Sequence, residues 1–252
     1  MSVSFSLEGR LSVVTGASRG IGFAMAKALA EAGSDVIAVS ASIPASGSAI
    51  GDAVEAAGRR FEAIACNFAD PAAVDELGRT LAGRPVDVLV NNAGTIERAP
   101  AVTHPLELWD RVLTVNLSSQ FRLTQAVAAG MIERGRGKVI FTASMLSFQG
   151  GVNVPGYTAA KSGVAGLTKA LANEWAPLGV NVNAIAPGYI ATDNTQALQD
   201  DPVRSRSILD RIPAGRWGEA DDLAGATVFL ASPASDYVDG IILPVDGGWL
   251  GR

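Results

Sequence analysis

The chain has 252 residues, of which 48% are hydrophobic, and it carries 20 Lys and Arg against 25 Asp and Glu, a net charge of −5. That length allows one large α/β domain. An acidic chain without a long basic run is a poor partner for nucleic acid or an anionic membrane, and no apolar run reaches transmembrane length. We therefore expect neither nucleic acid nor a membrane as a partner.

Cysteine and histidine each occur once. One cysteine excludes an intramolecular disulfide and favours a reducing compartment, so we expect a cytoplasmic protein. Cys66 lies in an apolar run and is expected to be buried and unreactive. A single histidine, His104, provides neither a zinc site nor a Ser-His-Asp triad. We expect no metal.

Short β-branched runs alternate along the chain with longer segments rich in Ala and Leu. Continuous apolar runs are typical of strands covered on both faces, and the alternation predicts right-handed βαβ units. The expected fold is α/β: a single-domain Rossmann-type doubly wound parallel sheet of about seven strands, with helices on both faces, over residues 1–252. The predicted strands are 11–15, 35–39, 61–65, 86–90, 138–142, 180–185 and 241–245, and the predicted helices are 21–32, 45–58, 71–81, 105–134, 156–177 and 220–231.

The first predicted strand leads into a glycine-rich loop, Thr15–Gly22, that precedes the first helix. Glycines let the backbone turn tightly and approach a pyrophosphate, and the helix N-terminus supplies N–H groups and the positive end of its dipole. A plain glycine turn is the alternative, but the position between strand and helix favours a dinucleotide site. The expected cofactor contacts here are Gly16, Ser18, Arg19, Gly20, Ile21 and Gly22.

The end of the second strand, Val39–Ser42, bears on the choice between the two nicotinamide cofactors. An acidic residue there would hold the ribose 2′-hydroxyl of NAD and repel a 2′-phosphate, and this chain has none. Ser40 and Ser42, together with Arg19 from the glycine loop, could bind a phosphate. The pattern slightly favours NADP(H) over NAD(H), although serines also line neutral NAD pockets.

The fourth predicted strand is followed by Asn91-Asn92-Ala93-Gly94. Two amides and a glycine at the carboxyl end of a strand suit a turn that lines a ligand cleft, and we expect Asn92, Ala93 and Gly94 to face the cofactor. A simple Asx turn explains the composition nearly as well.

Tyr157 and Lys161 stand four residues apart in a predicted helix, so they share one helix face. A free phenol has a pKa of about 10, and a nearby cation favours the phenolate and lowers that pKa. The hydroxyl of Ser144 could hold a substrate oxygen between itself and Tyr157, which suits proton transfer at an alcohol or carbonyl oxygen. By itself the spacing also fits a tyrosine ring packed on a lysine stem.

Residues 188–217 interrupt the alternation, because they are polar and rich in Asp, Arg, Thr and Gln. A long excursion after a strand is often a lid or a binding loop. We expect this segment to cover the substrate.

These motifs, in this order, resemble those of the short-chain dehydrogenase/reductase family, and the resemblance covers essentially the whole chain. It implies that Tyr157 is the general acid in ketone reduction and the base in alcohol oxidation. Lys161 would lower the pKa of Tyr157 and bind the nicotinamide ribose, and Ser144 would orient the substrate oxygen. Asn116 would hold a water in the proton path. Further implied cofactor contacts are Asn67 (where relatives usually carry Asp), Phe68, Pro187, Gly188, Ile190 and Thr192.

Within the family, the second half of the chain is similar to the 2-deoxy-D-gluconate 3-dehydrogenases, also described as 2-dehydro-3-deoxy-D-gluconate 5-dehydrogenases; Ile212–Gly218 is one such match. This similarity implies an NAD(P)-dependent oxidoreductase that interconverts a secondary alcohol and a ketone on a ketodeoxy sugar acid, and the family implies a homotetramer. Two alternatives stay open. One is a 3-oxoacyl-[acyl-carrier-protein] reductase, whose acidic carrier could dock on Arg134, Arg136 and Lys138. The other is a dinucleotide-sensing protein without catalysis.

A sugar acid needs hydrogen-bonding groups for its hydroxyls and a cation for its carboxylate. Arginine suits a carboxylate because its fork binds two oxygens at once. Arg98 and Arg206 are the candidates, and for each the alternative is a surface ion pair. Gln149 and Asn153, with Ser144, are the candidates for the hydroxyls.

Overall fold

The computed structural model describes residues 3–252, and within this range seven parallel strands form one sheet in the order β3-β2-β1-β4-β5-β6-β7. The strands are β1 (Leu11–Thr15), β2 (Asp35–Ser40), β3 (Phe61–Ala65), β4 (Val88–Asn91), β5 (Gly137–Thr142), β6 (Val180–Pro187) and β7 (Ile242–Val245). The predicted Rossmann-type sheet is confirmed. Its predicted strand ends lie close to those observed because strands buried on both faces are marked by their apolar runs.

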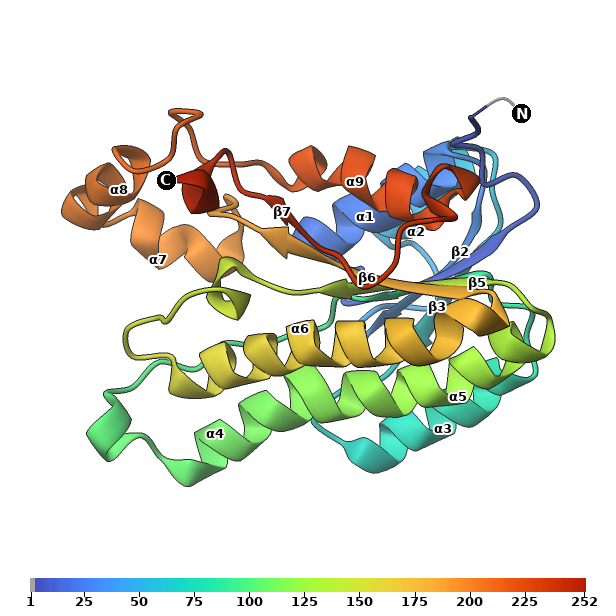
Figure 1. Cartoon of the computed structure of the whole chain (residues 1–252), viewed down its shortest axis with the longest axis horizontal. Helices are drawn as coiled ribbons and strands as arrows, with labels where there is room; N and C mark the ends of the chain where they lie inside the picture. The colour runs from blue at the N-terminus through green and yellow to red at the C-terminus, as the bar shows by residue number, and fades with distance from the viewer. Residues whose placement is uncertain (1–2) are drawn as a thin grey trace.

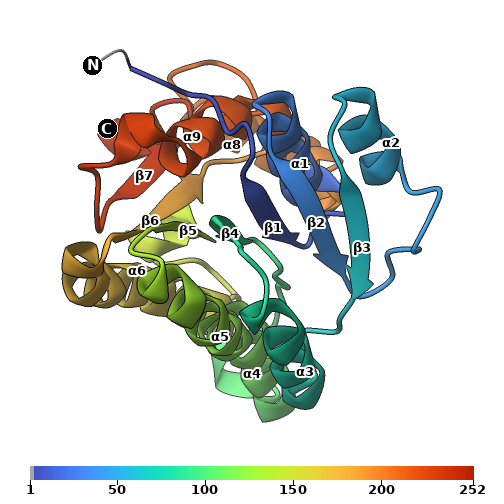
Figure 2. The ribbon, with the colours of Figure 1, turned by 90° about the vertical axis from the view of Figure 1, so that its right-hand side faces the viewer.

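Helices cover both faces of this sheet (Figures 1 and 2). One face carries α1 (Gly20–Glu31), α2 (Ala49–Ala56) and α9 (Ala224–Ala231), and the other carries α3 (Pro71–Ala82), α4 (Leu106–Leu113), α5 (Ser119–Glu133) and α6 (Pro155–Trp175). Adjacent strand residues point to opposite faces, so Val13 joins the core under α5 while Val14 joins the core under α1. Two apolar cores therefore hold the central strands from both sides.

The predicted single helix 105–134 is wrong in one respect. It is two α-helices, α4 and α5, joined by a π-helical turn at Thr114–Ser118. A π turn inserts one extra residue into a helix and is frequent at functional sites. Helix propensity does not mark such an insertion, so the sequence showed only a long helical pattern. The turn contains Asn116, one of the predicted catalytic residues.

Two other predicted helices are shorter than expected. The helix predicted for 45–58 begins at Ala49, because the Ser48 hydroxyl caps it by accepting from the Gly51 amide at 3.1 Å. The helix predicted for 220–231 starts with a 3₁₀ turn, Ala220–Leu223, and becomes α9 at Ala224.

Residues 188–217, here called the substrate loop, contain α7 (Gln196–Gln199) and α8 (Pro202–Leu209). They lie at the end of the molecule where β6 finishes, beside the 3₁₀ turn Trp249–Gly251 (Figure 1). No helix described in residues 3–252 combines the length and hydropathy needed to cross a membrane.

Candidate active site

The glycine loop after β1 is packed so closely that side chains are excluded at two of its glycines. Gly16 has a φ of +68°, and a Cβ on it would lie 2.9 Å from Nδ2 of Asn92. A Cβ on Gly22 would overlap both the Gly16 carbonyl and the Asn92 side-chain amide. The loop therefore presents bare backbone at the N-terminus of α1, as a pyrophosphate site requires.

The turn after β4 fastens this loop to the rest of the sheet. The amides of Asn92 and Ala93 both donate to Oγ1 of Thr15 at 2.9 Å, and Asn92 Nδ2 donates to the Thr15 carbonyl at 3.1 Å. Thr142 of β5 donates its hydroxyl to Asn92 Oδ1 at 3.2 Å, and Gln120 donates to the Ala93 carbonyl at 2.7 Å. The turn is thus more than a local Asx turn. Sequence reasoning missed Gln120 and Thr142 because nothing in their spacing connects them to this turn.

Ser144, Tyr157 and Lys161 come together between β5 and α6. Ser144 begins a 3₁₀ turn after β5, with its hydroxyl accepting from the Leu146 amide at 3.1 Å. That turn is bound to α6 because the Ser147 hydroxyl donates to the Lys161 carbonyl at 2.7 Å. Lys161 places its ammonium 5.6 Å from the Tyr157 ring centre and donates to the Thr142 carbonyl at 2.5 Å.

The electrostatics of this group set the proton chemistry. Burial raises the pKa of Tyr157, while the hydrogen bond with Ser144 and the positive charge of Arg98 lower it by less. Burial also lowers the pKa of Lys161 to about 8. The expectation that Lys161 lowers the pKa of Tyr157 stays a prediction for the cofactor-bound enzyme. In the chain alone the nearby groups that favour the phenolate are Ser144 and Arg98.

Asn116 is fully buried in the π-helical turn. Its Oδ1 accepts from the Thr95 amide at 2.8 Å and its Nδ2 donates to the Thr95 carbonyl at 2.7 Å. The side chain thus fixes the segment after Gly94, where a Cβ would lie 3.1 Å from Asn116 Oδ1. The role of Asn116 in holding a water in the proton path stays a prediction.

At the adenosine end the predicted residues differ in accessibility. Ser40 is buried, and its hydroxyl accepts from the Ser18 amide at 3.2 Å, whereas Ser42 is exposed. Arg19 is exposed, with Nε 3.5 Å from a carboxylate oxygen of Asp193 in the substrate loop. Ser42 and the exposed guanidinium of Arg19, which is in an ion pair with Asp193, stay candidates for binding a phosphate, while Ser40 shapes the glycine loop.

Two further predicted adenine contacts follow β3. Asn67 is exposed, and its Oδ1 accepts from the Ala69 amide at 3.0 Å, which leaves the side-chain N–H₂ to donate. Phe68 is buried in the core, and its carbonyl accepts from the Ser119 hydroxyl at 2.8 Å. Its side chain supports the fold, so a cofactor contact at Phe68 would fall on the backbone.

The segment after β6 closes the other side of the cleft. The Gly188 amide donates to the Val245 carbonyl at 2.9 Å, and Ile190 is buried and forms a β-bridge with Gly218. These contacts carry Thr192 to the glycine loop, where a Cβ on Gly20 would lie 3.6 Å from Thr192 Cγ2. Pro187, at the end of β6, precedes this turn. The predicted glycine loop and the segment after Pro187-Gly188 therefore lie next to each other.

The candidate substrate residues separate into two groups. Arg98 lies close enough to Tyr157 for its charge to lower the pKa of that phenol, and its Nη2 reaches the Asn194 carbonyl of the substrate loop at 3.5 Å. Arg206 instead forms an exposed i, i+4 ion pair with Asp210, 2.9 Å apart on α8. Arg98 therefore stays a predicted substrate contact, whereas Arg206 has the surface ion pair that was its alternative.

The two candidate hydroxyl ligands, Gln149 and Asn153, both follow the Ser144 turn. Gln149 Oε1 accepts from the indole N–H of Trp249 at 3.4 Å, so this oxygen is engaged within the chain. Asn153 has a φ of +62°, a conformation that asparagine tolerates better than most residues, and its carbonyl accepts from the Ala99 amide at 3.0 Å. That bond joins the Asn153 loop to the Arg98 segment.

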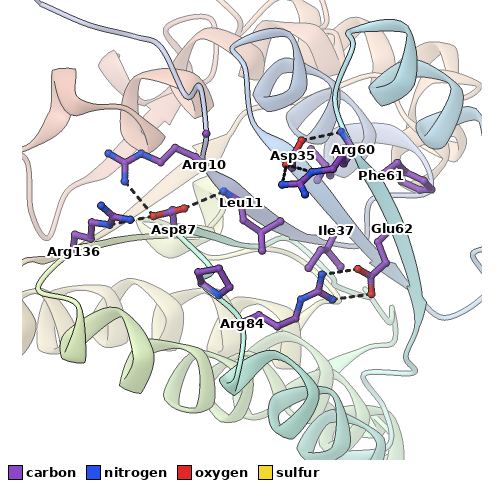
Figure 3. A pocket seen from close by; sticks show the side chains of 13 residues that line it. Arg10, Leu11, Asp35, Ile37, Arg60, Phe61, Glu62, Arg84, Asp87 and Arg136 are labelled. Carbon is purple, nitrogen blue, oxygen red and sulfur yellow. Dashed lines mark hydrogen bonds and ion pairs between the residues drawn. The ribbon is translucent and has the colours of Figure 1, made fainter.

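A cavity of about 490 Å³ lies at the amino ends of the strands, away from these motifs (Figure 3). Its four arginines are paired with carboxylates: Arg10 and Arg136 with Asp87, Arg60 with Asp35, and Arg84 with Glu62. These pairs link the starts of neighbouring strands. They form a structural network, and the residues predicted for catalysis lie at the opposite, carboxyl ends of the strands.

Cys66 is buried, and desolvation together with the nearby charge of Asp70 raises the pKa of its thiol to about 11. This agrees with the prediction of an inert cysteine. Among residues 3–252, no group of three His, Cys, Asp or Glu side chains is arranged to hold a metal ion.

Comparison with known proteins identifies the family. The family model described as Enoyl-(Acyl carrier protein) reductase matches residues 16–250. The chain belongs to the short-chain dehydrogenase/reductase family of oxidoreductases, as its motifs predicted.

Individual relatives narrow the class. The chain is 56% identical to the 2-dehydro-3-deoxy-D-gluconate 5-dehydrogenase of Pseudoalteromonas atlantica, over 100% of both chains. A proposed 2-deoxy-D-gluconate 3-dehydrogenase from Agrobacterium tumefaciens, solved with bound NADP, is 53% identical with a TM-score of 0.94 and 100% coverage of both chains. A gluconate 5-dehydrogenase from Burkholderia cenocepacia, solved with NADP and tartrate, is 37% identical with a TM-score of 0.92, covering 99% of this chain and 98% of that one.

Proposed function

We propose that this protein interconverts a secondary alcohol and a ketone on a ketodeoxy sugar acid, as its 2-dehydro-3-deoxy-D-gluconate 5-dehydrogenase relatives are named for doing, with NADP(H) as the preferred cofactor. The observation that carries the substrate class is Arg98, whose Nη2 reaches the Asn194 carbonyl of the substrate loop at 3.5 Å and whose charge is near enough to lower the pKa of Tyr157. A guanidinium there can bind a carboxylate two-pronged while the reacting oxygen lies at Ser144 and Tyr157.

In this proposal the glycine loop would hold the pyrophosphate of the cofactor and Thr192 its nicotinamide end, and the cofactor would supply or accept the hydride. Ser144 and Tyr157 hold the substrate oxygen, and Tyr157 gives it a proton in reduction or takes one in oxidation. The raised pKa of Tyr157 keeps the phenol protonated at neutral pH, which suits reduction. The bond from the Lys161 ammonium to the Thr142 carbonyl holds the Tyr157 helix, α6, against the end of β5.

A panel of sugar acids and neutral polyols, assayed by nicotinamide absorbance with both cofactors, tests this assignment. Arg98→Gln should raise KM for an acidic substrate by about tenfold or more and leave a neutral analogue unchanged. Arg206→Gln is the matched control, because it removes an equal charge from the same end of the molecule and should change neither. Equal losses on acidic and neutral substrates would remove Arg98 from the carboxylate site.

The cofactor preference rests on Arg19 and Ser42, which are exposed, and on the absence of an acid at the end of β2. Arg19→Gln should weaken NADPH binding and leave NADH binding nearly unchanged. Tighter binding of NADH than NADPH by the unaltered enzyme would reject the preference.

The acyl-carrier alternative loses support from its basic cluster. Arg134 donates to the Val86 carbonyl at 2.5 Å, Arg136 pairs with Asp87 at 3.4 Å, and Lys138 pairs with Asp236 at 2.8 Å. All three cations thus have partners within the chain. A fatty acyl substrate in the same panel distinguishes the two functions directly.

We also propose a cytoplasmic homotetramer. Support comes from the family and from exposed apolar side chains on α4 and α5, such as Leu106 and Phe121. Ala126 of α5 is not available for a contact between subunits, because it packs inside the chain, 2.9 Å from where a Cβ on Gly78 would lie. Light scattering at micromolar concentration measures the assembly, and a monomer would reject this part of the proposal.

A further inference from the structure

The segment 245–252, here called the Trp249 segment, packs against both ends of the substrate loop. At the start of the loop, the Gly188 amide donates to the Val245 carbonyl at 2.9 Å, and a Cβ on Gly188 would lie 2.5 Å from Asp246 Cα. At the far end, the Ala214 amide donates to the Gly247 carbonyl at 3.0 Å. Figure 1 shows this segment beside α7 and α8.

Trp249 is the centre of this contact. It is 4% exposed, and its ring lies 4.8 Å from that of Tyr189 in an edge-on arrangement. The guanidinium carbon of Arg211 lies 4.0 Å from the Trp249 ring centre, within the range of a cation–π contact. Tyr189 stacks edge-on against Trp217 in turn, 5.5 Å away. One indole therefore holds side chains from the first residues and the last residues of the loop.

The same indole reaches the catalytic turn. Met145, which follows Ser144, belongs to the buried apolar cluster around Trp249, with Ile208 and Ile212 of the loop. The indole N–H also donates to Gln149 Oε1 at 3.4 Å. The Ser144 turn and the substrate loop therefore share one small core, separate from the two cores that hold the sheet.

The glycine loop does not share this core. It is held by Asn92, and no member of the Trp249 cluster belongs to the glycine loop or to the turn after β4. Tyr189 of the cluster does lie between Gly188 and Ile190, two of the expected cofactor contacts. Loosening the cluster should thus disturb the substrate side most, the nicotinamide end of the cofactor site less, and the glycine loop least.

We infer that Trp249 is a positioning residue for the substrate: it fixes the substrate loop against the Ser144 turn, so that Arg98, the loop and the catalytic hydroxyls form one pocket. This inference rests on the proposed function for the identity of the substrate. It concerns ground-state positioning, because Trp249 itself is packed on Met145 and Tyr189 and leaves proton transfer to Ser144 and Tyr157.

Trp249→Ala tests the inference in the full-length protein. We expect KM for the sugar acid to rise about tenfold, with a smaller change in kcat and a smaller loss of NADPH affinity measured by fluorescence. Trp249→Phe keeps an aromatic ring against Tyr189 and Arg211, so its KM should lie close to that of the unaltered enzyme. An unchanged KM, or an equal loss of NADPH affinity, would overturn the inference.

Limited trypsin digestion gives a readout that needs no substrate. The loop contains Arg204, Arg206 and Arg211, and Trp249→Ala should speed cleavage after them. Trp175→Ala is the matched control, because it removes a buried indole from α6, outside this core. If Trp175→Ala accelerates loop cleavage as much as Trp249→Ala, the effect is general destabilisation and the inference is wrong. If the unaltered enzyme uses no sugar acid, the proposed function fails while the digestion result still decides the role of Trp249.

Discussion

The side-chain amide of Asn92 donates to the carbonyl of Thr15 at 3.1 Å, and this bond fixes the distance between the glycine loop and the turn after β4. The same Asn92 nitrogen is the atom that a Cβ on Gly22 would overlap. The small size of Gly22 and the amide of Asn92 therefore depend on each other: the glycine leaves the space that the amide fills.

Gly22→Ala should severely weaken cofactor binding and lower the free energy of unfolding, because the methyl group would push Asn92 and the Gly16 carbonyl apart. Overpacking of this kind costs about 1–3 kcal/mol. Calorimetric titration with NADPH and urea unfolding measure the two effects. Gly166→Ala is the control: a Cβ there meets nothing within 4 Å, and on helix α6 it should be neutral or stabilising by up to about 1 kcal/mol.

Tyr157→Phe should reduce kcat by about 10²–10⁴-fold, the range for loss of a general acid or base. Because the ring is retained, NADPH affinity should be unchanged. Stopped-flow or steady-state assays with the best sugar acid provide the rate. Activity within threefold of the unaltered enzyme (about 0.7 kcal/mol) would exclude Tyr157 as the proton donor.

The rates of ketone reduction and of alcohol oxidation should change with pH in opposite senses. Since burial raises the pKa of Tyr157, reduction should be flat near neutral pH and fall in alkali, whereas oxidation should rise with pH over the same alkaline range. Arg98→Gln removes a charge that lowers this pKa, so it should move the midpoint of both limbs to higher pH. A midpoint that stays fixed or moves to lower pH would contradict the assignment. Profiles of kcat/KM against pH make the comparison.

Lys161→Met should stabilise the fold at neutral pH. The folded chain releases the Lys161 proton near pH 8, while the unfolded chain keeps it to its ordinary pKa of 10.5. The unfolded state therefore binds more protons between these values, so the free energy of unfolding rises with pH there, and the full cost of the buried ammonium is present below pH 8.

The expected gain for Lys161→Met is on the order of 2–3 kcal/mol at pH 7 and shrinks as pH approaches 10.5. Urea unfolding at a series of pH values measures it. Lys169→Met, at an exposed position on the same helix, should show no such trend. A Lys161→Met protein that is less stable at pH 7 would show that the bond to the Thr142 carbonyl outweighs the burial of the charge.

The features that the sequence predicted well are those with a local physical mark. All four residues of the run Val36–Val39 are apolar and buried, and such a continuous apolar run predicts a central strand. The glycine loop and the Tyr157–Lys161 pair are likewise fixed by short-range spacing.

Features that depend on distant contacts had no such mark. The π turn around Asn116 arises from packing between α4, α5 and α6, where Leu117 lies 2.9 Å from a Cβ built on Gly163. Gln120 bonds to Ala93 across 27 positions of the chain. Arg206, predicted as a carboxylate contact, instead forms the surface ion pair that was its alternative, with Asp210 one helical turn away.

Because Cys66 is buried and unreactive, a cysteine introduced at the surface of this protein could be labelled without labelling of the natural one. A maleimide reacts with thiolate, and a buried thiol whose pKa is about 11 offers almost none at neutral pH. A cysteine introduced at Val203, which is 77% exposed on α8, would therefore be the one residue to take a fluorophore in the native protein. A change in its emission on adding cofactor or substrate would report a change in the surroundings of α8, without removal of the natural cysteine.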